Sequence, residues 1–490
     1  MLRRTCLTLP AAAGVAAVAA SPADPYLSAI EASRRIRRKE LSARELLEMQ
    51  LKQIERVNPK VNAIVTLVAD AARRTAARLD EEAAHGRFAG PLHGLPMAHK
   101  DLQDTAGIRT TYGSPLYRDH VPERSTLMIE RLQQAGAVTI GKTNTPEFGA
   151  GSQTFNPVFG PTRNPYDLGR TCGGSSGGAA VALACGMIPL ADGSDTGGSL
   201  RNPASFCSVV GFRSSPGRIP RVPSGAGWNT ISVNGPMARS VEDVALLFSA
   251  MAGPDPRFPI ALDEPGEGFR RPLGRDFKGV RIAWMPRFAG LPFDRRIAAE
   301  FAARRREFES LGCIVEEVTG PDFSEADEVF KVLRALSFYS QHAAKVAAHR
   351  GQIKATVLEE VDRGAKLTGP QIAAAETKRS ALFARMGEFL RNYEYMVLPT
   401  TQVPPFPVET EYITEIDGVK MGNYIDWMRS CWYITILGNP AISVPGGYTP
   451  EGLPVGVQIV GRHHADFAVL QLAHAYEQAS RKLWRRPAVS

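Results

Sequence analysis

The chain reads Gly173-Gly174-Ser175-Ser176-Gly177-Gly178 and, a little further on, Asp195-Thr196-Gly197-Gly198-Ser199-Leu200-Arg201. Each motif sets serine among glycines, and Ser175 and Ser199 are 24 positions apart. A third motif, Gly94-Leu95-Pro96-Met97-Ala98-His99-Lys100-Asp101, places a lysine 75 positions before Ser175. A serine hydroxyl is a weak nucleophile until a base takes its proton, and a neutral lysine can be that base. The three motifs together therefore indicate serine–lysine hydrolytic chemistry.

In order, spacing and flanking glycines, the motifs closely resemble those of the amidase signature family, whose Ser-Ser-Lys triad hydrolyses amide bonds. The resemblance implies that Ser199 is the nucleophile, that Lys100 is the base, and that Ser175 relays the proton between them. It also implies a cis peptide bond before Ser175, where Gly174 would ease the crowding. The reaction it implies needs neither a cofactor nor a metal ion.

The glycines of the second serine motif suit a loop whose backbone N–H groups stabilise the transition state. Amide hydrolysis passes through a tetrahedral oxyanion, and one backbone N–H group aimed at that oxygen contributes roughly 3–4 kcal/mol. The resemblance implies that the N–H groups of Thr196, Gly197 and Gly198, with that of the nucleophilic serine, form this oxyanion hole. Asp195 and Arg201 flank the run, and we expect them to pair and to hold the loop.

Lys100 has to be neutral in order to act as a base. The pKa of a free lysine is about 10.4, and burial lowers it by disfavouring the charged form. The apolar stretch from Leu95 to Ala98 fits a dry site, so we expect the rate to fall at low pH as Lys100 becomes protonated. His99 stands where the family more often has an aliphatic residue. Because neighbours on an extended strand face opposite ways, we interpret it as a packed residue.

The resemblance extends from about residue 27 to 485 and implies a single large α/β domain, in which helices flank one mixed β-sheet. It is loose between about 255 and 430, the region that usually shapes the substrate pocket in such families. The Pro/Gly-rich stretch 253–274 is the candidate boundary between the core and that region. We expect residues 1–20 to be an export signal and residues 21–490 to be the amidase domain.

Hydrophobic periodicity agrees with an α/β fold. Helical patterns cover Ala43 to Arg56 and Asp294 to Leu311, whereas short apolar runs typical of strands cover Val280 to Trp284 and Tyr395 to Leu398. Four aromatic residues near the C-terminus are candidates either for the wall of an apolar pocket or for the core: Tyr424, Trp427, Trp432 and Tyr433.

Residues 136–143 match the phosphate-loop pattern G-x-x-x-x-G-K-[ST]. That pattern is meaningful only between a strand and a helix. Here the expected strand, Val138 to Ile140, lies between the two glycines, and a helix from Leu127 to Gln134 is expected to end at Gly136. Asn144-Thr145-Pro146 then favours a turn. We therefore predict no nucleotide binding, with Gly136 capping the helix and the following lysine leading into a loop near the site.

Net charge and the N-terminus bear on partners and location. The net charge is +8, and its densest run is Arg34-Arg35-Ile36-Arg37-Arg38-Lys39. Because no aromatic residue is interleaved with this run, we interpret it as a solvated helix face rather than a nucleic-acid or membrane patch. Arg3-Arg4, an apolar run from Leu7 to Ala20 and small residues before Ser21 are typical of a bacterial export signal.

The apolar run is too short for a membrane span of about 20 residues. We therefore expect an exported protein, periplasmic or secreted, without stable membrane insertion. It would be cytoplasmic if the segment is not a signal. The resemblance of this segment to a twin-arginine signal is weak.

The cysteines and histidines give no metal-binding pattern. Loss of the signal would remove Cys6 and leave five cysteines, so at least one stays free or pairs outside the chain. Their spacing is too wide for a zinc motif, and His463-His464 is adjacent rather than spaced for one helix face. The five remaining cysteines are Cys172, Cys185, Cys207, Cys313 and Cys431.

These features favour a cofactor-independent serine amidase that acts on a small-molecule amide. One alternative on the same fold is the A subunit of a transfer-RNA-dependent amidotransferase, which an export signal disfavours because transfer RNA and ATP are cytoplasmic. Another is a non-catalytic binding protein, which the complete set of three triad positions disfavours. The identity of the amide and the presence of a homo-oligomer stay open.

Overall fold

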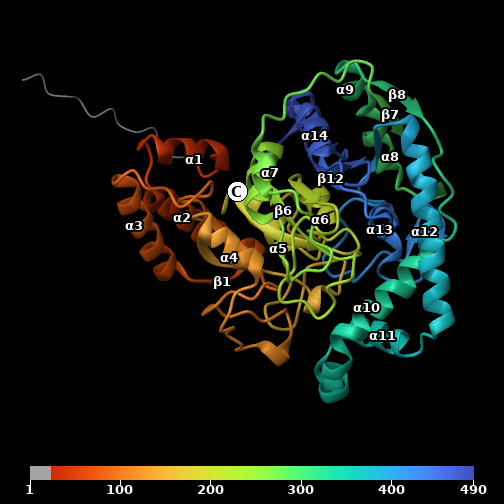
Figure 1. The fold of residues 1–490 in the computed structure, drawn as a ribbon, viewed down its shortest axis with the longest axis horizontal. Helices are drawn as coiled ribbons and strands as arrows, with labels where there is room; N and C mark the ends of the chain where they lie inside the picture. Colours follow the sequence, from red (N-terminus) through yellow and green to blue (C-terminus); the bar gives the residue numbers. More distant parts are fainter. Residues whose placement is uncertain (1–23, 490) are drawn as a thin grey trace, which may run out of the picture.

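A computed structural model describes residues 24–489 of the chain. The export-signal segment 1–20, with Cys6, lies outside the described residues and stays a prediction. Within them, one mixed sheet of 11 strands is flanked by helices, which confirms the expected fold class (Figure 1). Among the described residues, no helix is both long and apolar enough to cross a bilayer.

The strands of the large sheet do not follow one another in chain order. The neighbours β2–β3, β2–β4, β7–β8 and β7–β9 are parallel and the other pairs are antiparallel. From one edge of the sheet to the other, the strands are β1 (Ile64–Leu67), β3 (Val138–Thr143), β2 (Pro96–Lys100), β4 (Leu190–Asp195), β6 (Val233–Ala238), β5 (Val210–Arg213), β12 (Ala441–Tyr448), β13 (Pro454–Gly461), β9 (Tyr395–Pro399), β7 (Arg281–Trp284) and β8 (Ile314–Glu317).

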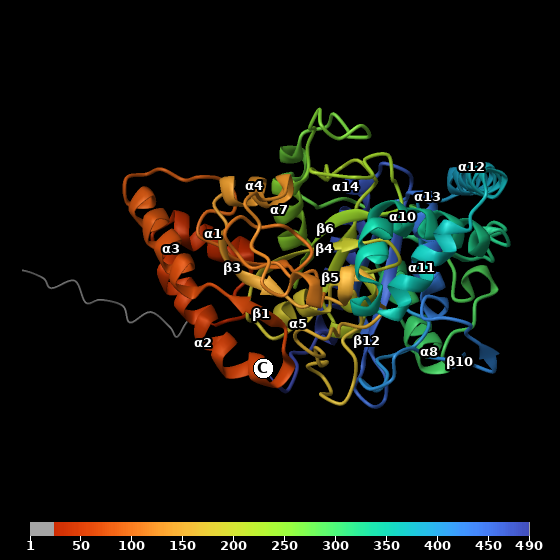
Figure 2. The same ribbon diagram turned by 90° about the horizontal axis from the view of Figure 1, so that it is seen from below.

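Figures 1 and 2 both place helices α1–α3 and helices α10–α12 at opposite ends of the molecule. A small separate ribbon is formed by β10 (Glu415–Ile416) and β11 (Val419–Lys420). The helices are α1 (Ala29–Arg37), α2 (Ala43–Val61), α3 (Ala69–Ala84), α4 (Leu127–Gln134), α5 (Gly177–Ala184), α6 (Arg201–Cys207), α7 (Val241–Met251), α8 (Arg295–Ala303), α9 (Arg305–Ser310), α10 (Ala326–His349), α11 (Ala355–Ala365), α12 (Gly369–Asn392), α13 (Arg429–Leu437) and α14 (Asp466–Ser480).

Local sequence explains where the expected helices begin and break. Ser42 and Glu45 form a capping box at the start of α2, which satisfies two backbone donors of its first turn. The helix expected from Asp294 to Leu311 is divided into α8 and α9 at Arg304. There the N–H of Arg304 bonds to the carbonyl of Phe301, three residues back rather than four.

The region from 255 to 430 is built into the same sheet as the rest of the chain. The apolar runs expected to be strands are β7 and β9, and β8 pairs with β7. This region also supplies α8–α12. The region that least resembles the family therefore contributes three strands to the core sheet.

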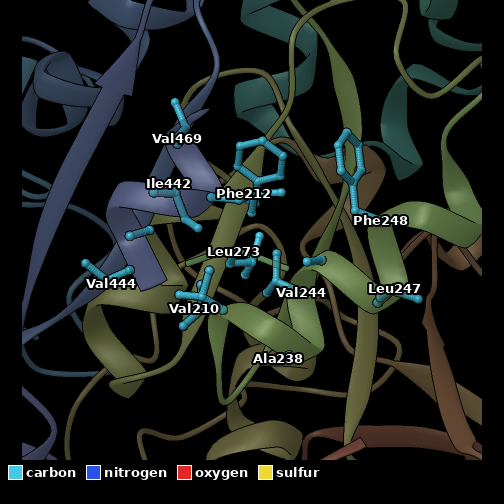
Figure 3. Close-up of a cluster of buried hydrophobic side chains, with 14 of the residues drawn as sticks. Val210, Phe212, Ala238, Val244, Leu247, Phe248, Leu273, Ile442, Val444 and Val469 are labelled. Atoms are coloured by element: carbon cyan, nitrogen blue, oxygen red, sulfur yellow. The ribbon is translucent and has the colours of Figure 1, made fainter. Parts of the chain in front are cut away.

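Part of the core lies where α7 and α14 pack on the sheet (Figure 3). Phe212 of β5 and Phe248 of α7 meet edge to face, with ring centroids 5.1 Å apart. Val469 of α14 and Ile442 of β12 belong to the same buried cluster. Full burial of one such side chain contributes roughly 1.5–3 kcal/mol.

Residues 136–143 match the phosphate-loop pattern but do not form a phosphate loop. Helix α4 ends before Gly136, whose φ is +93°, as expected. However, β3 runs on through Lys142 and Thr143, beyond the strand expected to end at Ile140, because it continues to pair with β2. Lys142 therefore belongs to a buried strand, the loop into which it leads begins at Asn144, and the next helical segment is a single 3₁₀ turn, Glu147–Gly149.

Several further expectations concern single residues. The five cysteines in residues 24–489 are all buried and unpaired. Within the basic run, Arg34 and Arg35 lie on α1 and pair with Glu31 at 2.6 and 3.0 Å, as on a solvated helix face. No group of three or more metal-binding side chains is present in the described part of the chain.

Candidate active site

Lys100 is the last residue of β2, and its side chain is fully buried. Its Nζ lies 2.7 Å from Ser175 Oγ, 2.9 Å from Ser176 Oγ and 3.1 Å from Ser194 Oγ. Burial lowers the pKa of Lys100 to about 7, although the carboxylates of Asp195 and Asp192 oppose the shift. A substantial share of Lys100 is therefore neutral near pH 7, and its amine faces hydroxyl groups that can exchange protons with it.

Ser175 reaches Lys100 from the turn that precedes α5. The Gly174–Ser175 peptide bond is cis, as the family resemblance implies. The turn is packed so closely that glycine is required after it: a Cβ on Gly178 would lie 2.3 Å from the backbone nitrogen of Asn144. The serine at this turn is thus held by backbone packing against the loop after β3.

Ser199 lies in the loop between β4 and α6. The carboxylate of Asp195 folds this loop, because it accepts hydrogen bonds from the N–H groups of Gly198 at 3.0 Å and Leu200 at 3.1 Å. Gly198 has a φ of +111°, and a Cβ there would lie 2.6 Å from the Cβ of Cys431. The N–H of Gly198 thus already donates to Asp195. The sequence-based prediction had instead assigned this N–H to the oxyanion hole.

The expected pair of Asp195 and Arg201 forms. Both side chains are fully buried, and Arg201 donates to the two carboxylate oxygens from Nε at 3.0 Å and Nη2 at 2.8 Å. Arg213 also donates to the backbone carbonyl of Asp195, at 2.6 Å. These arginines hold the pKa of Asp195 well below its usual range, so it is charged at neutral pH.

His99 is packed, as expected from its place on the strand. It is fully buried, with Nδ1 2.6 Å from Asp192 Oδ2 and Nε2 3.0 Å from Thr139 Oγ1. The other oxygen of Asp192 accepts the backbone N–H of Lys100 at 3.1 Å. His99 therefore helps to fix the end of β2, and the hydrogen bonds of its ring go to Asp192 and Thr139 rather than to the serines.

A cavity of about 460 Å³ opens beside these groups. Ser175, Ser194 and Ser199 all line it, together with Thr196 and Gly197. The structure thus brings Lys100, Ser175 and the loop of Ser199 to one cavity, with Lys100 behind the serines. Gly198 is the one predicted site residue on that loop that does not line it.

Comparison with known proteins identifies the family. The family model described as Amidase matches residues 45–470. This chain belongs to the amidase signature family. An acylamidase of Rhodococcus erythropolis is 33% identical over 467 residues, covering 95% of this chain and 98% of that protein. The A subunit of the glutamyl-tRNA(Gln) amidotransferase of Synechococcus sp. strain CC9605 is 35% identical over 472 residues, covering 91% of this chain and 95% of that protein.

Solved structures of amidase signature enzymes superpose along nearly the whole chain. A bacterial aryl acylamidase of this family has a TM-score of 0.87 and 29% identity, covering 93% of this chain and 96% of that one. A 6-aminohexanoate cyclic dimer hydrolase complexed with substrate has a TM-score of 0.86 and 26% identity, covering 95% of this chain and 100% of that one. The amidase signature fold is therefore shown.

Two hydroxyl partners of Lys100 in this amidase signature site were missed from the sequence, namely Ser176 and Ser194. Each stands next to a motif residue that was recognised, but nothing in the sequence shows that its side chain turns toward the lysine. Of the four C-terminal aromatic residues, only Tyr424 lines the cavity, whereas Trp427, Trp432 and Tyr433 are buried in the core.

Proposed function

We propose that this protein is a serine amidohydrolase that cleaves a carboxylic amide through an acyl-enzyme on Ser199. The observation that carries the proposal is the buried lysine, whose Nζ lies 2.7 Å from Ser175 Oγ at the wall of the cavity lined by Ser199. The similarity to an acylamidase and to an aryl acylamidase supports amides as the substrate class.

The proposed reaction moves one proton along a short relay. Ser199 Oγ attacks the amide carbon and gives its proton to Ser175 Oγ, while the hydroxyl proton of Ser175 passes to neutral Lys100. The ammonium of Lys100 then returns a proton through Ser175 to the leaving nitrogen, and the C–N bond breaks. Water hydrolyses the acyl-enzyme by the same relay in reverse. Esters with similar acyl groups should react by the same route.

We propose that the oxyanion binds at the N–H groups of Thr196 and Gly197, which line the cavity, and of Ser199 itself. Gly198 was included in the sequence-based prediction, but its N–H already donates to Asp195. In this proposal Gly198 therefore shapes the loop, and its neighbours meet the charge that develops in the transition state.

A second candidate is the A subunit of a transfer-RNA-dependent amidotransferase, because relatives with that name are as similar to this chain as the acylamidase. The two candidates differ in whether the chain acts alone. An amidohydrolase turns over amides by itself, whereas an amidotransferase subunit requires its partner subunits. The export predicted from residues 1–20 supports the first candidate.

Hydrolysis of a mixed amide panel by the isolated protein tests the proposal. We expect turnover that Ser199→Ala and Lys100→Ala each abolish, with labelling by a fluorophosphonate only where Ser199 is present. Turnover that survives in Ser199→Ala would overturn the mechanism. Labelling without turnover, together with activity restored by amidotransferase partner subunits, would favour the second candidate.

A further inference from the structure

Arg221 lies in the segment between β5 and β6 and lines the same cavity as Ser199. Its guanidinium makes one hydrogen bond within residues 24–489, a long contact of 3.5 Å from Nη2 to the carbonyl of Asn229. The Nε of Arg221 is buried and has no hydrogen-bond partner there. A buried donor without a partner costs free energy and calls for a physical reason.

The other arginine that lines this cavity has a carboxylate: Arg334 lies 2.7 Å from Glu360. Arg218, three positions before Arg221 in the chain and outside the cavity lining, is also paired, at 2.9 Å from Asp466. Burial lowers the pKa of Arg221 to about 10, and no carboxylate opposes that shift. Arg221 is still a cation at neutral pH, and it lacks the counter-ion that a partly buried charge normally has.

The remaining charges of the cavity do not supply that counter-ion. Of the described residues that line it, Asp104 carries the only carboxylate, and that group accepts the hydroxyl of Tyr112. Lys345 is a further cation of the lining, beside Arg221 and the paired Arg334, and its Nζ donates to a backbone carbonyl. Burial and the nearby Lys345 lower the pKa of His342 to about 4, so its ring is neutral. The cavity is therefore cationic around a guanidinium without a carboxylate.

We propose that Arg221 binds a carboxylate of the substrate, so that the preferred amides are those that carry an anionic group beside the scissile bond. This inference rests on the proposed amidohydrolase function. The planar guanidinium of Arg221 can donate to carboxylate oxygens through its Nη groups, which make only the long contact to Asn229 within the described residues. Monoamides of dicarboxylic acids place the carboxylate on the acyl side, and N-acyl amino acids place it on the amine side.

Matched anilides separate these two arrangements. N-phenylsuccinamate and neutral pentananilide differ on the acyl side, whereas 4-acetamidobenzoate and neutral 4-acetylacetanilide differ on the amine side. We expect the wild-type kcat/KM, measured by release of the aniline, to favour at least one carboxylate substrate over its neutral partner by about tenfold or more. That ratio should fall to about one in Arg221→Met and should be partly retained in Arg221→Lys.

Arg257→Met is the matched control, because Arg257 is an exposed arginine already paired with Asp255 at 2.9 Å. It should keep the wild-type ratio. A wild-type ratio near one for both anilide pairs would overturn the proposal, and so would a preference that persists in Arg221→Met.

Binding to the Ser199→Ala protein separates this inference from the proposed function. Calorimetry should show tighter binding of a carboxylate anilide than of its neutral partner, and Arg221→Met in the same background should remove the difference. Equal binding of the two would overturn the inference even if amides are hydrolysed. Absence of wild-type turnover on all four anilides, with absence of fluorophosphonate labelling, would instead count against the amidohydrolase.

Discussion

Two buried lysines stand on neighbouring strands of the same sheet, and they do different work. Lys100 on β2 and Lys142 on β3 are both fully buried, and burial lowers their pKa values to about 7 and about 8. Lys100 faces three serine hydroxyls, two of which line the cavity. Lys142 instead donates to the carbonyl of Gln103 and to Thr105 Oγ1, and it does not line the cavity.

The difference shows that burial alone does not make a lysine a base. Burial lowers the pKa of both amines, but a base also needs a hydroxyl partner that reaches the cavity. Lys142 contacts the hydroxyl of Thr105, yet that hydroxyl donates to the carbonyl of Gln103 and Thr105 does not line the cavity. Lys142 therefore ties the segment after β2 to β3. We therefore expect the two lysines to separate cleanly in activity and in stability.

The largest effect is expected from Lys100→Met. It removes the proposed base, so amidase activity should fall by about 10⁴-fold or more, as for loss of a catalytic triad member. The folded protein should melt close to wild type, because removal of an amine that is costly to bury offsets the loss of its contacts, and two of the three hydroxyls left behind line the cavity, where water can reach them. Amide hydrolysis and thermal melts measure both quantities. Retention of more than a hundredth of the activity would contradict the assignment of the base.

The pH dependence of the rate gives the next test. Protonation of Lys100 removes the base, so log kcat/KM of the wild type should fall by about one per pH unit below pH 7. Lys142→Met should keep this acid limb, because Lys142 is not part of the relay. A flat profile between about pH 5 and 9 would rule out Lys100 as the titrating base.

The free energy of unfolding should also rise with pH, but over a higher pH range than the rate. The pKa of Lys100 is lower in the folded state, so between about pH 7 and 10 the unfolded state binds more protons. Stability therefore gains a contribution that rises with pH, by up to about 1 kcal/mol per pH unit, and that is lost as pH falls toward 7. Denaturant unfolding at several pH values gives the free energy of unfolding as a function of pH. That free energy should rise less steeply with pH in Lys100→Met than in wild type. An unchanged slope would mean that Lys100 keeps its proton on folding.

Lys142→Met should act mainly on stability. It leaves the carbonyl of Gln103 and the hydroxyl of Thr105 without their buried donor, which costs about 1–3 kcal/mol. The loop from Asp101 to Thr105 borders the cavity through Leu102–Asp104, so activity should fall by about tenfold or less. Chemical denaturation and amide hydrolysis measure the two effects. A loss of activity as large as that of Lys100→Met, in folded protein, would erase the distinction between the lysines.

The sequence predicted the fold and the principal elements because their signals are local or carried by motifs. The helical pattern of α2 and the apolar runs of β7 and β9 are readable from short stretches. The pair of Asp195 and Arg201 was readable because its members flank one short loop. The hydrogen bond from Gly198 to Asp195 could not be predicted from the sequence, because it depends on the backbone path of that loop.

Contacts between distant segments could not be read from the chain. The length of β3 depends on pairing with β2, so the sequence ended this strand at Ile140, whereas it continues through Lys142 to Thr143. Arg221 was not singled out, because its missing carboxylate becomes visible only when the packing around it is known. The roles of Lys100, Ser175 and Ser199 were predicted from the resemblance of the motifs, and the structure adds that Ser175 and Ser199 line one cavity with Lys100 directly behind Ser175.

The smallest loss of activity is expected when the hydroxyl group of Ser194 is removed. Ser194→Ala removes the longest of the three contacts of Lys100 Nζ, at 3.1 Å, and leaves those to Ser175 and Ser176. Because Ser194 is outside the proposed relay, kcat/KM should fall by only about three- to tenfold and the acid limb should persist. Ser175→Ala should cost far more, although it too removes one hydroxyl beside the same amine. Equal losses in the two variants would mean that the hydroxyls merely solvate Lys100, and that Ser175 does not carry the proton.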